Sequence, residues 1–203
     1  MLIKNAKPLA AISYDTQTYG QLRKFIQADE GIDLARIAPE DFFKNPTTDY
    51  QYINLVVKDF DQRKKVSVIL DQENLDRFTY IGEDSTASRF HANNINVGQG
   101  CMLFPGVWIY SGSLGNDVIV HSLVKMAENV RVGNGCFFSG STTIAGNCKI
   151  GNWCFLGNNL FFIDHVEICD DVKLLPGTNL RKSITEPGTY YNPHTYKVEK
   201  ILV

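Results

Sequence analysis

The sequence lacks an excess of charge of either sign. Its 203 residues include 20 basic and 22 acidic side chains, which gives a formal net charge of −2, and its pI is about 6.1. No long run of like charges occurs. Because nucleic acids and anionic membranes are bound through concentrated basic surfaces, we expect neither among the main partners.

The first residues also lack the pattern of a targeting segment. The stretch MLIKNAKPLAAIS is too short and too interrupted for a signal peptide or a membrane span. The default expectation is a soluble, cytoplasmic protein. The length allows one large domain or two small ones around a buried core.

Metal-ligand spacing is missing as well. No CxxC pair occurs, and the four histidines, His91, His121, His165 and His194, are scattered along the chain. Zinc sites gather such ligands at short, regular spacings. The sequence therefore predicts no metal site.

What the sequence does have is a six-residue repeat. Large apolar residues recur at every sixth position without a gap: Leu114, Val120, Met126, Val132, Phe138, Ile144, Ile150, Leu156, Phe162, Ile168, Leu174 and Leu180. A second column lies four residues after each of these: Val118, Val124, Val130, Cys136, Thr142, Cys148, Cys154, Leu160, Val166, Val172 and Thr178. Its members are mostly small or β-branched, as short strands around a tight interior require. A fixed period of this length is typical of a solenoid.

Three hexads form a longer period of eighteen residues. It shows in four triplets, Leu114-Gly115-Asn116, Val132-Gly133-Asn134, Ile150-Gly151-Asn152 and Ile168-Cys169-Asp170. Glycine and asparagine tolerate positive φ, so we expect each triplet to turn a corner of a triangular coil. Successive coils would stack about 4.8 Å apart, like neighbouring strands. The cysteines of the second column, together with Cys101, are then expected to be buried, reduced thiols.

The repeat has irregular ends and one informative outer column. Leu114 follows Ile109 by five residues, which predicts a one-residue deletion in the first coil. Ile119, Phe137 and Phe155 lie eighteen residues apart and predict an apolar stripe on the outside, which self-association would cover. The alternative to such a stripe is that these three residues lie at a flexible corner, or at a corner that the repeat assigns wrongly.

Residues 1–80 lack the six-residue period. Strands are expected near 8–13, 32–37 and 52–57, and helices near 21–28 and 60–67, with a turn or short helix near 39–43. The run 66–70 fits a further strand equally well. Such alternation indicates a small α/β unit with a parallel sheet. Its first loop, 13–20, contains one late glycine, so it is either a weak nucleotide site or a plain connection.

The hexads resemble those of the hexapeptide acyltransferases. Gly or Ala follows the aliphatic residue in Leu114-Gly115, Met126-Ala127, Val132-Gly133, Ile144-Ala145, Ile150-Gly151 and Leu156-Gly157. The resemblance implies a left-handed parallel β-helix, a homotrimer, and an acyl-CoA donor in the groove between neighbouring coils. A non-catalytic assembly subunit built on the same scaffold is the alternative.

The two-part layout is similar to that of the NeuD-like sugar O- or N-acetyltransferases, most strongly over residues 97–180. The resemblance implies a Rossmann-like domain over 1–80 that holds a nucleotide sugar, a β-helix over 81–185 and a cap over 186–203. It also implies transfer of an acetyl or related acyl group to a sugar amino or hydroxyl group in surface glycan biosynthesis. A hexapeptide-type carbonic anhydrase is disfavoured, because it needs three histidines around a metal.

The resemblance also suggests site residues. Glu128 stands where the family usually has a histidine base, and Phe137 where a second histidine lies near the donor. His121 and His165 are further candidates for the base, although His165 also fits a polar ladder with Asn147 and Asn129. A substrate amine that loses its own proton would need no base. The sites that relatives use for the acyl-CoA donor fall on Gly146, Asn158 and Gly177.

Overall fold

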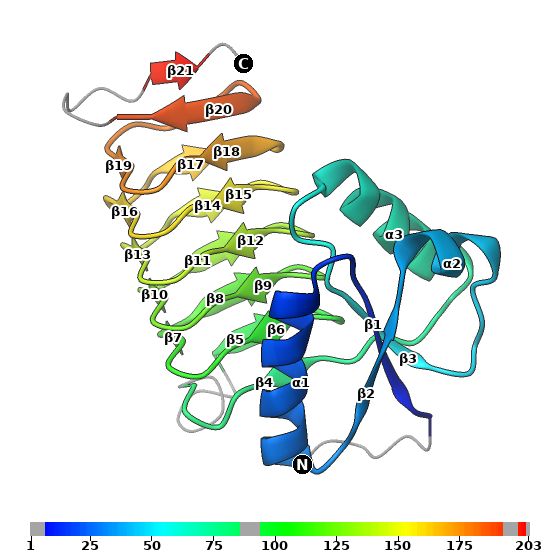
Figure 1. Ribbon diagram of the computed structural model, residues 1–203. Coiled ribbons are helices and arrows are strands. Elements are labelled where there is room, and N and C mark those ends of the chain that lie inside the picture. The colour runs from blue at the N-terminus through cyan, green and yellow to red at the C-terminus, as the bar shows by residue number, and fades with distance from the viewer. Residues whose placement is uncertain (1–6, 86–93, 193–198, 202–203) are drawn as a thin grey trace. The chain divides into compact units, whose positions relative to one another are not determined.

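The computed structural model describes residues 7–85, 94–192 and 199–201. The chain divides into two compact units, Met1–Thr79 and Tyr80–Val203 (Figure 1). His91 and His194 lie outside the described residues.

The first unit is a small α/β unit with a parallel sheet. Its elements are β1 (Leu9–Ile12), α1 (Thr16–Glu30), β2 (Leu34–Ile37), α2 (Pro39–Lys44), β3 (Gln51–Asn54) and α3 (Phe60–Gln72). The strand order is β2-β1-β3, and β1 pairs in parallel with both neighbours. The three strands lie where the sequence predicts them. The run 66–70 belongs to α3, so the alternative of a further strand there is wrong.

The expected start of the first helix was also wrong. Residues 16–20 were predicted to be loop, but α1 begins at Thr16 because Asp15 caps it, with the Asp15 side chain accepting from the Gln17 N–H at 3.0 Å. The helix ends at Gly31, whose φ of +67° closes the last turn with a bond to the Gln27 carbonyl. Polar capping residues thus add a full turn that the apolar pattern alone does not reveal.

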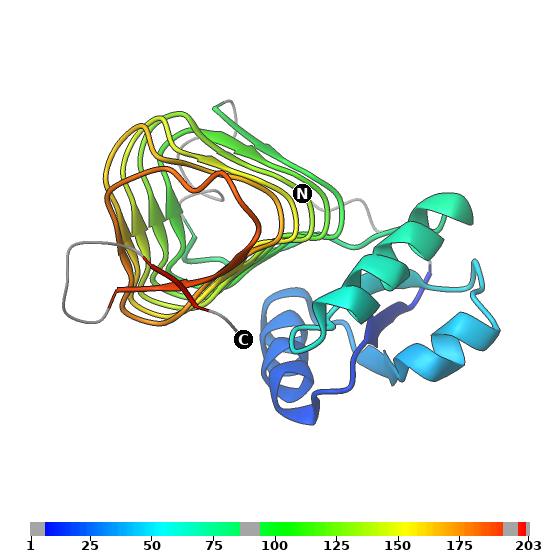
Figure 2. The same ribbon diagram turned by 90° about the horizontal axis from the view of Figure 1, so that it is seen from above.

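The second unit is a parallel β-helix with three sheets, seen end-on as a rounded triangle in Figure 2. Sheet I contains β4 (Tyr80–Ile81), β6 (Met102–Leu103), β9 (Ile119–Val120), β12 (Phe137–Phe138), β15 (Phe155–Leu156), β18 (Val172–Leu174), β20 (Gly188–Tyr191) and β21 (Glu199–Ile201). Sheet II contains β7 (Trp108–Ile109), β10 (Lys125–Met126), β13 (Thr143–Ile144), β16 (Phe161–Phe162) and β19 (Asn179–Leu180). Sheet III contains β5 (Ile95–Val97), β8 (Gly112–Leu114), β11 (Val130–Val132), β14 (Lys149–Ile150) and β17 (Glu167–Ile168).

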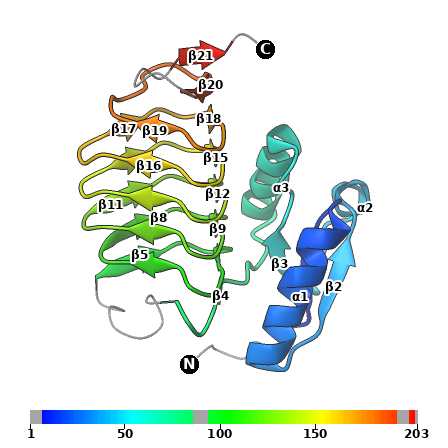
Figure 3. The same cartoon turned by 60° about the vertical axis from the view of Figure 1, so that its left-hand side comes forward.

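The coils stack in the predicted register. Val132 pairs with Ile150, eighteen residues later, whereas Val97 pairs with Leu114, seventeen later. The missing residue falls in the Tyr110–Ser111 corner, which has two residues where the next coil has three, Ala127–Asn129. At the far end β20 pairs in parallel with β18 and antiparallel with β21 (Figure 3). The predicted solenoid and its one-residue deletion are confirmed.

Both predicted inner columns form the core of the β-helix. The sixfold positions from Leu114 to Leu180 are all buried, and so are the four cysteines of the inner column, which are free thiols. The Cys136 thiol donates to the Gly151 carbonyl at 3.0 Å, and the Cys101 thiol to the Gly115 carbonyl at 3.0 Å. Thiols therefore satisfy polar backbone atoms inside the coil while packing as small apolar groups.

The coil turns at three corners. Corner 1 connects sheets I and II and includes residues 122–123, 140–141, 158–159 and 176–177; corner 2 connects sheets II and III and includes 110–111, 127–129, 145–147 and 163–165; corner 3 connects sheets III and I and includes 115–117, 133–135, 151–153 and 169–171. At corner 3, positive φ was expected within the Gly-Asn triplets. It falls one residue later instead, at Asp117, Gly135, Trp153 and Asp171.

The outer apolar stripe forms in register but is less exposed than expected. Ile119 pairs with Phe137, and Phe137 with Phe155. Ile119 and Phe137 are buried, and only Phe155 keeps partial exposure. The stripe by itself therefore gives weaker support for self-association than the sequence suggested.

Candidate functional site

Corner 2 brings Glu128 and Gly146 together on successive coils. The Asn147 N–H donates to the Glu128 carbonyl at 2.8 Å, which fixes the stacking of the two corners. A Cβ atom on Gly146 would lie 2.5 Å from Glu128 Oε1. The glycine therefore leaves the space in which the exposed Glu128 carboxylate lies. Two residues predicted for different roles, base and donor contact, therefore lie against each other, with the Glu128 side chain covering the buried Gly146.

His165 lies on the next coil of the same corner. The His165 backbone N–H donates to the Gly146 carbonyl at 3.0 Å, and the ring atom Nδ1 lies 3.0 Å from Asp164 Oδ2. The predicted ladder is formed by Asn129 and Asn147, whose side chains share a hydrogen bond of 3.2 Å. With φ near +60° at all three positions, this column turns the corner. The contacts of His165 fit a structural role at the corner.

His121 lies elsewhere, directly after β9 of sheet I, in a stack of aromatic side chains from neighbouring coils. Its ring stacks on Phe104 with a centroid distance of 4.5 Å and meets the edge of Phe137 at 5.6 Å. Phe137 in turn stacks on Phe155 at 5.4 Å. Burial lowers the pKa of His121 below its ordinary value of 6.5. The imidazole is therefore mainly neutral near pH 7 and able to accept a proton.

The remaining donor candidates stack on each other at corner 1. The Gly177 N–H donates to the Asn158 carbonyl at 2.9 Å. Gly177 has a φ of +79°, and an added Cβ there would meet nothing within 4 Å. Sheet II separates this corner from corner 2, where Glu128, Gly146 and His165 lie. On the other side of sheet II, at sheet I and corner 1, the predicted residues form two groups on different coils: His121 with Phe137, and Asn158 with Gly177.

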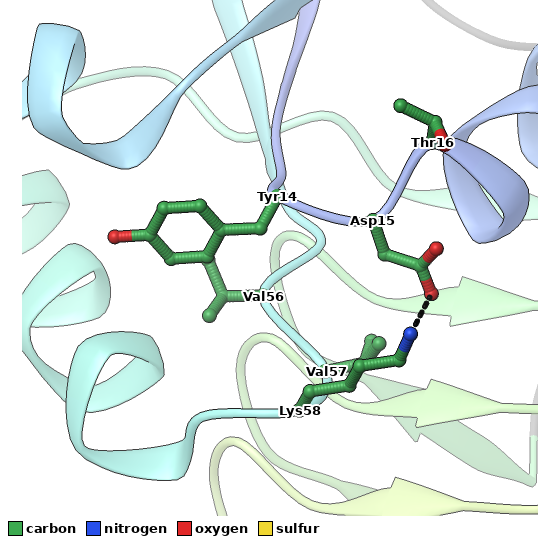
Figure 4. A pocket seen from close by; sticks show the side chains of 6 residues that line it. All are labelled: Tyr14, Asp15, Thr16, Val56, Val57 and Lys58. Atoms are coloured by element: carbon green, nitrogen blue, oxygen red, sulfur yellow. Dashed lines mark ion pairs between the residues drawn. The ribbon is translucent and has the colours of Figure 1, made fainter.

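A separate pocket of about 300 Å³ lies in the α/β unit (Figure 4). The segments after β1 and β3 line it, with Tyr14, Asp15 and the first residue of α1, Thr16, from the first and residues 56–58 from the second. The strand order is β2-β1-β3, so the chain leaves β1 towards one edge of the sheet and leaves the adjacent β3 towards the other edge. Open parallel sheets bind ligands at the carboxyl ends of strands at such a switch point.

Charge in this pocket is arranged around Asp15. Its carboxylate accepts from the Thr18 hydroxyl at 2.8 Å and lies 3.4 Å from Lys58 Nζ. These contacts, the Thr18 bond first, lower the pKa of Asp15. A carboxylate already occupies the positive end of α1, so a phosphate would be repelled there. Lys58, whose side chain is 80% exposed, is the cation in the pocket lining that could bind an anionic group.

Sequence reasoning found only half of this pocket. It singled out the loop 13–20 but not Lys58 and its neighbours, because their role depends on which strands are adjacent. The usable signal was the strongest predicted strand, 52–57, since loops after neighbouring parallel strands meet at one edge of a sheet.

The three-sided coil of hexads defines the class of the fold: it is that of the hexapeptide-repeat, left-handed β-helix acyltransferases. Two solved structures superpose on nearly the whole chain. The acetyltransferase domain of PglB from Neisseria gonorrhoeae FA1090 has a TM-score of 0.81 and 13% identity, and covers 96% of this chain and 100% of that chain. PerB from Caulobacter crescentus, in complex with CoA and GDP-perosamine, has a TM-score of 0.77 and 15% identity, and covers 98% and 99%.

Sequence similarity points to a further acyltransferase. UDP-3-O-acylglucosamine N-acyltransferase from Bordetella avium is 34% identical over 104 residues, which are 51% of this chain and 28% of that protein. The chain thus matches less than a third of that relative's length. No family model matches the chain.

Membrane-spanning helices and metal-binding clusters are both absent from the described residues. Within the ranges 7–85, 94–192 and 199–201, no helix is long and apolar enough to cross a membrane. The same ranges hold no group of three or more His, Cys, Asp or Glu side chains arranged to bind a metal ion.

Proposed function

We propose that this chain transfers an acetyl or related acyl group from acyl-CoA to the amino group of a nucleotide-linked sugar. The observation that carries the proposal is the pair at corner 2, where the Glu128 carboxylate lies across Gly146 on an acyltransferase scaffold. Similarity to an N-acyltransferase and to structures that hold CoA and a nucleotide sugar supports it. Surface glycan synthesis is the setting in which such a product would be used.

The reaction requires one proton to be removed and one carbonyl to be polarised. The neutral amine attacks the thioester carbonyl carbon, and a tetrahedral intermediate forms. This intermediate collapses to the amide, with CoA leaving as thiolate. Glu128 accepts the proton that the amine loses and returns it to the sulfur. Because Glu128 is exposed in one chain, the substrate or a second chain must exclude water for the carboxylate to act as an effective base.

A homotrimer would supply such a second chain. In the trimer the donor is proposed to lie along the coil surface, against Gly146 on one chain and the stacked pair Asn158 and Gly177 on another. The backbone at Gly177 is exposed, with nothing within 4 Å of an added Cβ, whereas the Glu128 side chain covers Gly146 and would have to swing aside for the donor. A pantetheine arm can therefore approach closely and bond to the coil wall.

The α/β unit is proposed to be a Rossmann-like domain that binds the nucleotide part of the acceptor. Its pocket lies at the switch point of the sheet, with Tyr14 as an aromatic wall and Lys58 as a cation. Because Asp15 caps α1, the phosphates are expected to bind near Lys58 and not at the helix N-terminus. We place the enzyme in the cytoplasm, where acyl-CoA and nucleotide sugars are available.

The test is turnover with defined substrates. Acetyl-CoA would be incubated with UDP-, GDP- and dTDP-linked amino sugars, and release of free thiol measured. Thiol release with at least one amino sugar, and none with the corresponding sugar lacking the amine, is expected. Failure of every acyl-CoA to raise the melting temperature, together with no thiol release, would contradict the proposal.

Two variants then assign the base. Glu128→Gln keeps the shape of the side chain but cannot accept the proton, so kcat should fall at least about a hundredfold. His121→Ala serves as the comparison, because His121 lies outside corner 2. A loss in His121→Ala alone would transfer the role to the neutral imidazole, and near-normal rates in both would indicate that the amine deprotonates without a base.

A non-catalytic assembly subunit is the second candidate. It is favoured by one observation, the glutamate in place of the histidine that the resemblance leads one to expect. This candidate predicts an oligomer that binds no CoA thioester.

A further inference from the structure

A polar hollow of about 450 Å³ lies on the outer face of sheet III. It spans three successive coils, with Ser111–Ser113 as its floor. Asn96 forms one wall and Arg131 the other, because Asn96, Ser113 and Arg131 are paired in register. Tyr110 lines one side of the hollow.

The missing residue in the first coil creates this hollow. The short corner at Tyr110–Ser111 leads directly into Gly112, which has a φ of +140°. A Cβ atom at Gly112 would collide with the Val130 carbonyl, so no larger residue fits. The next residue, Ser113, is small and lies between two longer side chains. Backbone and small side chains thus recess the surface at this point only in the first coil.

The lining groups select the charge of a ligand. Among the residues that the structure describes, they are one guanidinium and several amides and hydroxyls, without a carboxylate. The neighbours of Arg131 in the register are Ser113 and Lys149, neither of which is acidic. Lys149 is itself paired with Glu167 at 2.6 Å. A guanidinium in such a setting binds carboxylate or phosphate through two parallel hydrogen bonds.

The other lining groups suit a hydroxylated ring. Amide and hydroxyl side chains both donate and accept, as sugar hydroxyls require. Tyr110 is 49% exposed and its ring centroid lies 5.9 Å from that of Trp108, so an aromatic edge borders the polar floor. The volume is that of a small-molecule site.

We propose that this hollow is a binding site for an anionic monosaccharide, with the phosphate or carboxylate on Arg131 and the hydroxyls on the floor and the Asn96 wall. The site goes beyond the proposed transfer reaction, because neither the acyl donor nor the nucleotide is placed there. It includes residues of corner 2, among them Asn129, which lines the hollow and bonds to Asn147 on the next coil. Its occupancy can be measured without turnover.

Calorimetric titration of the full chain, without CoA, tests the site. Glucose 1-phosphate, glucuronate, glucose and inorganic phosphate are the probes. One or both anionic sugars should bind at least about tenfold tighter than glucose, since a charge-assisted pair contributes at that scale. Glucose 1-phosphate should also bind tighter than inorganic phosphate. Whichever of glucose 1-phosphate and glucuronate binds more tightly shows whether the site prefers phosphate or carboxylate.

Variants locate the binding. Arg131→Gln should abolish the preference for anionic sugars, and Ser113→Leu should weaken binding of all sugars by filling the hollow. Lys149→Gln is the matched control, because Lys149 is a neighbouring cation on the same face but outside the lining. Equal binding of glucose and glucose 1-phosphate, or a preference that survives Arg131→Gln, overturns the proposal. No binding of any probe also overturns it, while leaving the transfer assay unaffected.

Discussion

At the scale of single residues, the β-helix is built from contacts eighteen positions apart. At corner 3 the Asn134 side chain accepts from the Asn116 N–H at 2.8 Å, and the Asn152 side chain accepts from the Asn134 N–H at 2.8 Å. Each asparagine therefore satisfies a backbone donor on the preceding coil. This bonding explains why positive φ falls one residue after each triplet: the asparagine keeps the conformation that aims its side chain along the stack.

Two glycines that look alike in the sequence should respond differently to an added methyl group. In Gly133→Ala the Cβ meets backbone atoms of the next coil, Gly151 C and Asn152 N at 2.8 Å, which cannot move away. In Gly146→Ala it meets the end of the flexible Glu128 side chain. We expect urea denaturation to show a loss of about 1–3 kcal/mol for Gly133→Ala and little change for Gly146→Ala.

Gly146→Ala should instead reduce acyl transfer, because the added methyl group displaces the Glu128 carboxylate from its position across residue 146. Equal stability losses in the two variants would show that Glu128 is held rigidly. An unchanged transfer rate in Gly146→Ala would argue against a role for this corner in the reaction.

His121 should make stability depend on pH in a defined direction. Its folded-state pKa lies below the ordinary 6.5 because of burial, so between these two values the unfolded chain binds more protons than the folded one. Stability is therefore unaffected well above pH 6.5 and falls as the pH decreases below it. Unfolding of the native chain and of His121→Gln, compared from about pH 7 to about pH 5, isolates this contribution. A native chain that loses no more stability than His121→Gln would contradict the burial of the imidazole.

At the scale of elements, regular period and strand order differ in how far they can be predicted. Counting in sixes and eighteens locates every β-helix strand from Leu114 to Leu180, because each strand pairs with the equivalent strands of adjacent coils. The same counting stacks Glu128 on Gly146. The α/β pocket is different, since Tyr14 and Lys58 meet only because β3 is placed beside β1. No local pattern records that adjacency.

The cap of α1 provides a test at this scale. Asp15→Ala removes the bond to the Gln17 N–H and should destabilise the α/β unit by about 1 kcal/mol. Asp15→Asn keeps an acceptor at the cap but loses the charge facing Lys58 at 3.4 Å, so most of the stability should remain. Loss of helical circular dichroism on heating measures both variants. Equal losses would mean that the ion pair, and not the cap, stabilises the start of α1.

At the scale of the whole molecule, the candidate residues form three groups that one chain does not unite. Glu128 at corner 2 is separated by sheet II from Gly177 at corner 1. His121 directly follows β9 and lies on the same side as Gly177, but three coils away from it. The period of the repeat predicts which residues stack within each group, but not which groups come together in an oligomer. If a reaction site contains more than one group, a second chain must supply the rest, which is a physical reason for expecting an oligomer.

Two units with separate ligands should also be stabilised separately. Both tryptophans, Trp108 and Trp153, lie in the β-helix, whereas the three helices of the described chain all lie in the α/β unit. Tryptophan fluorescence therefore reports unfolding of the β-helix, and helical circular dichroism reports mainly unfolding of the α/β unit. An acyl-CoA at about a hundred times its Kd should stabilise the β-helix by ~2.7 kcal/mol, and a nucleotide sugar should do the same for the α/β unit. Each ligand should thus shift mainly one probe. If the nucleotide sugar shifted only the fluorescence transition, the α/β unit would not be the nucleotide-binding part, and the pocket at Lys58 would need another explanation.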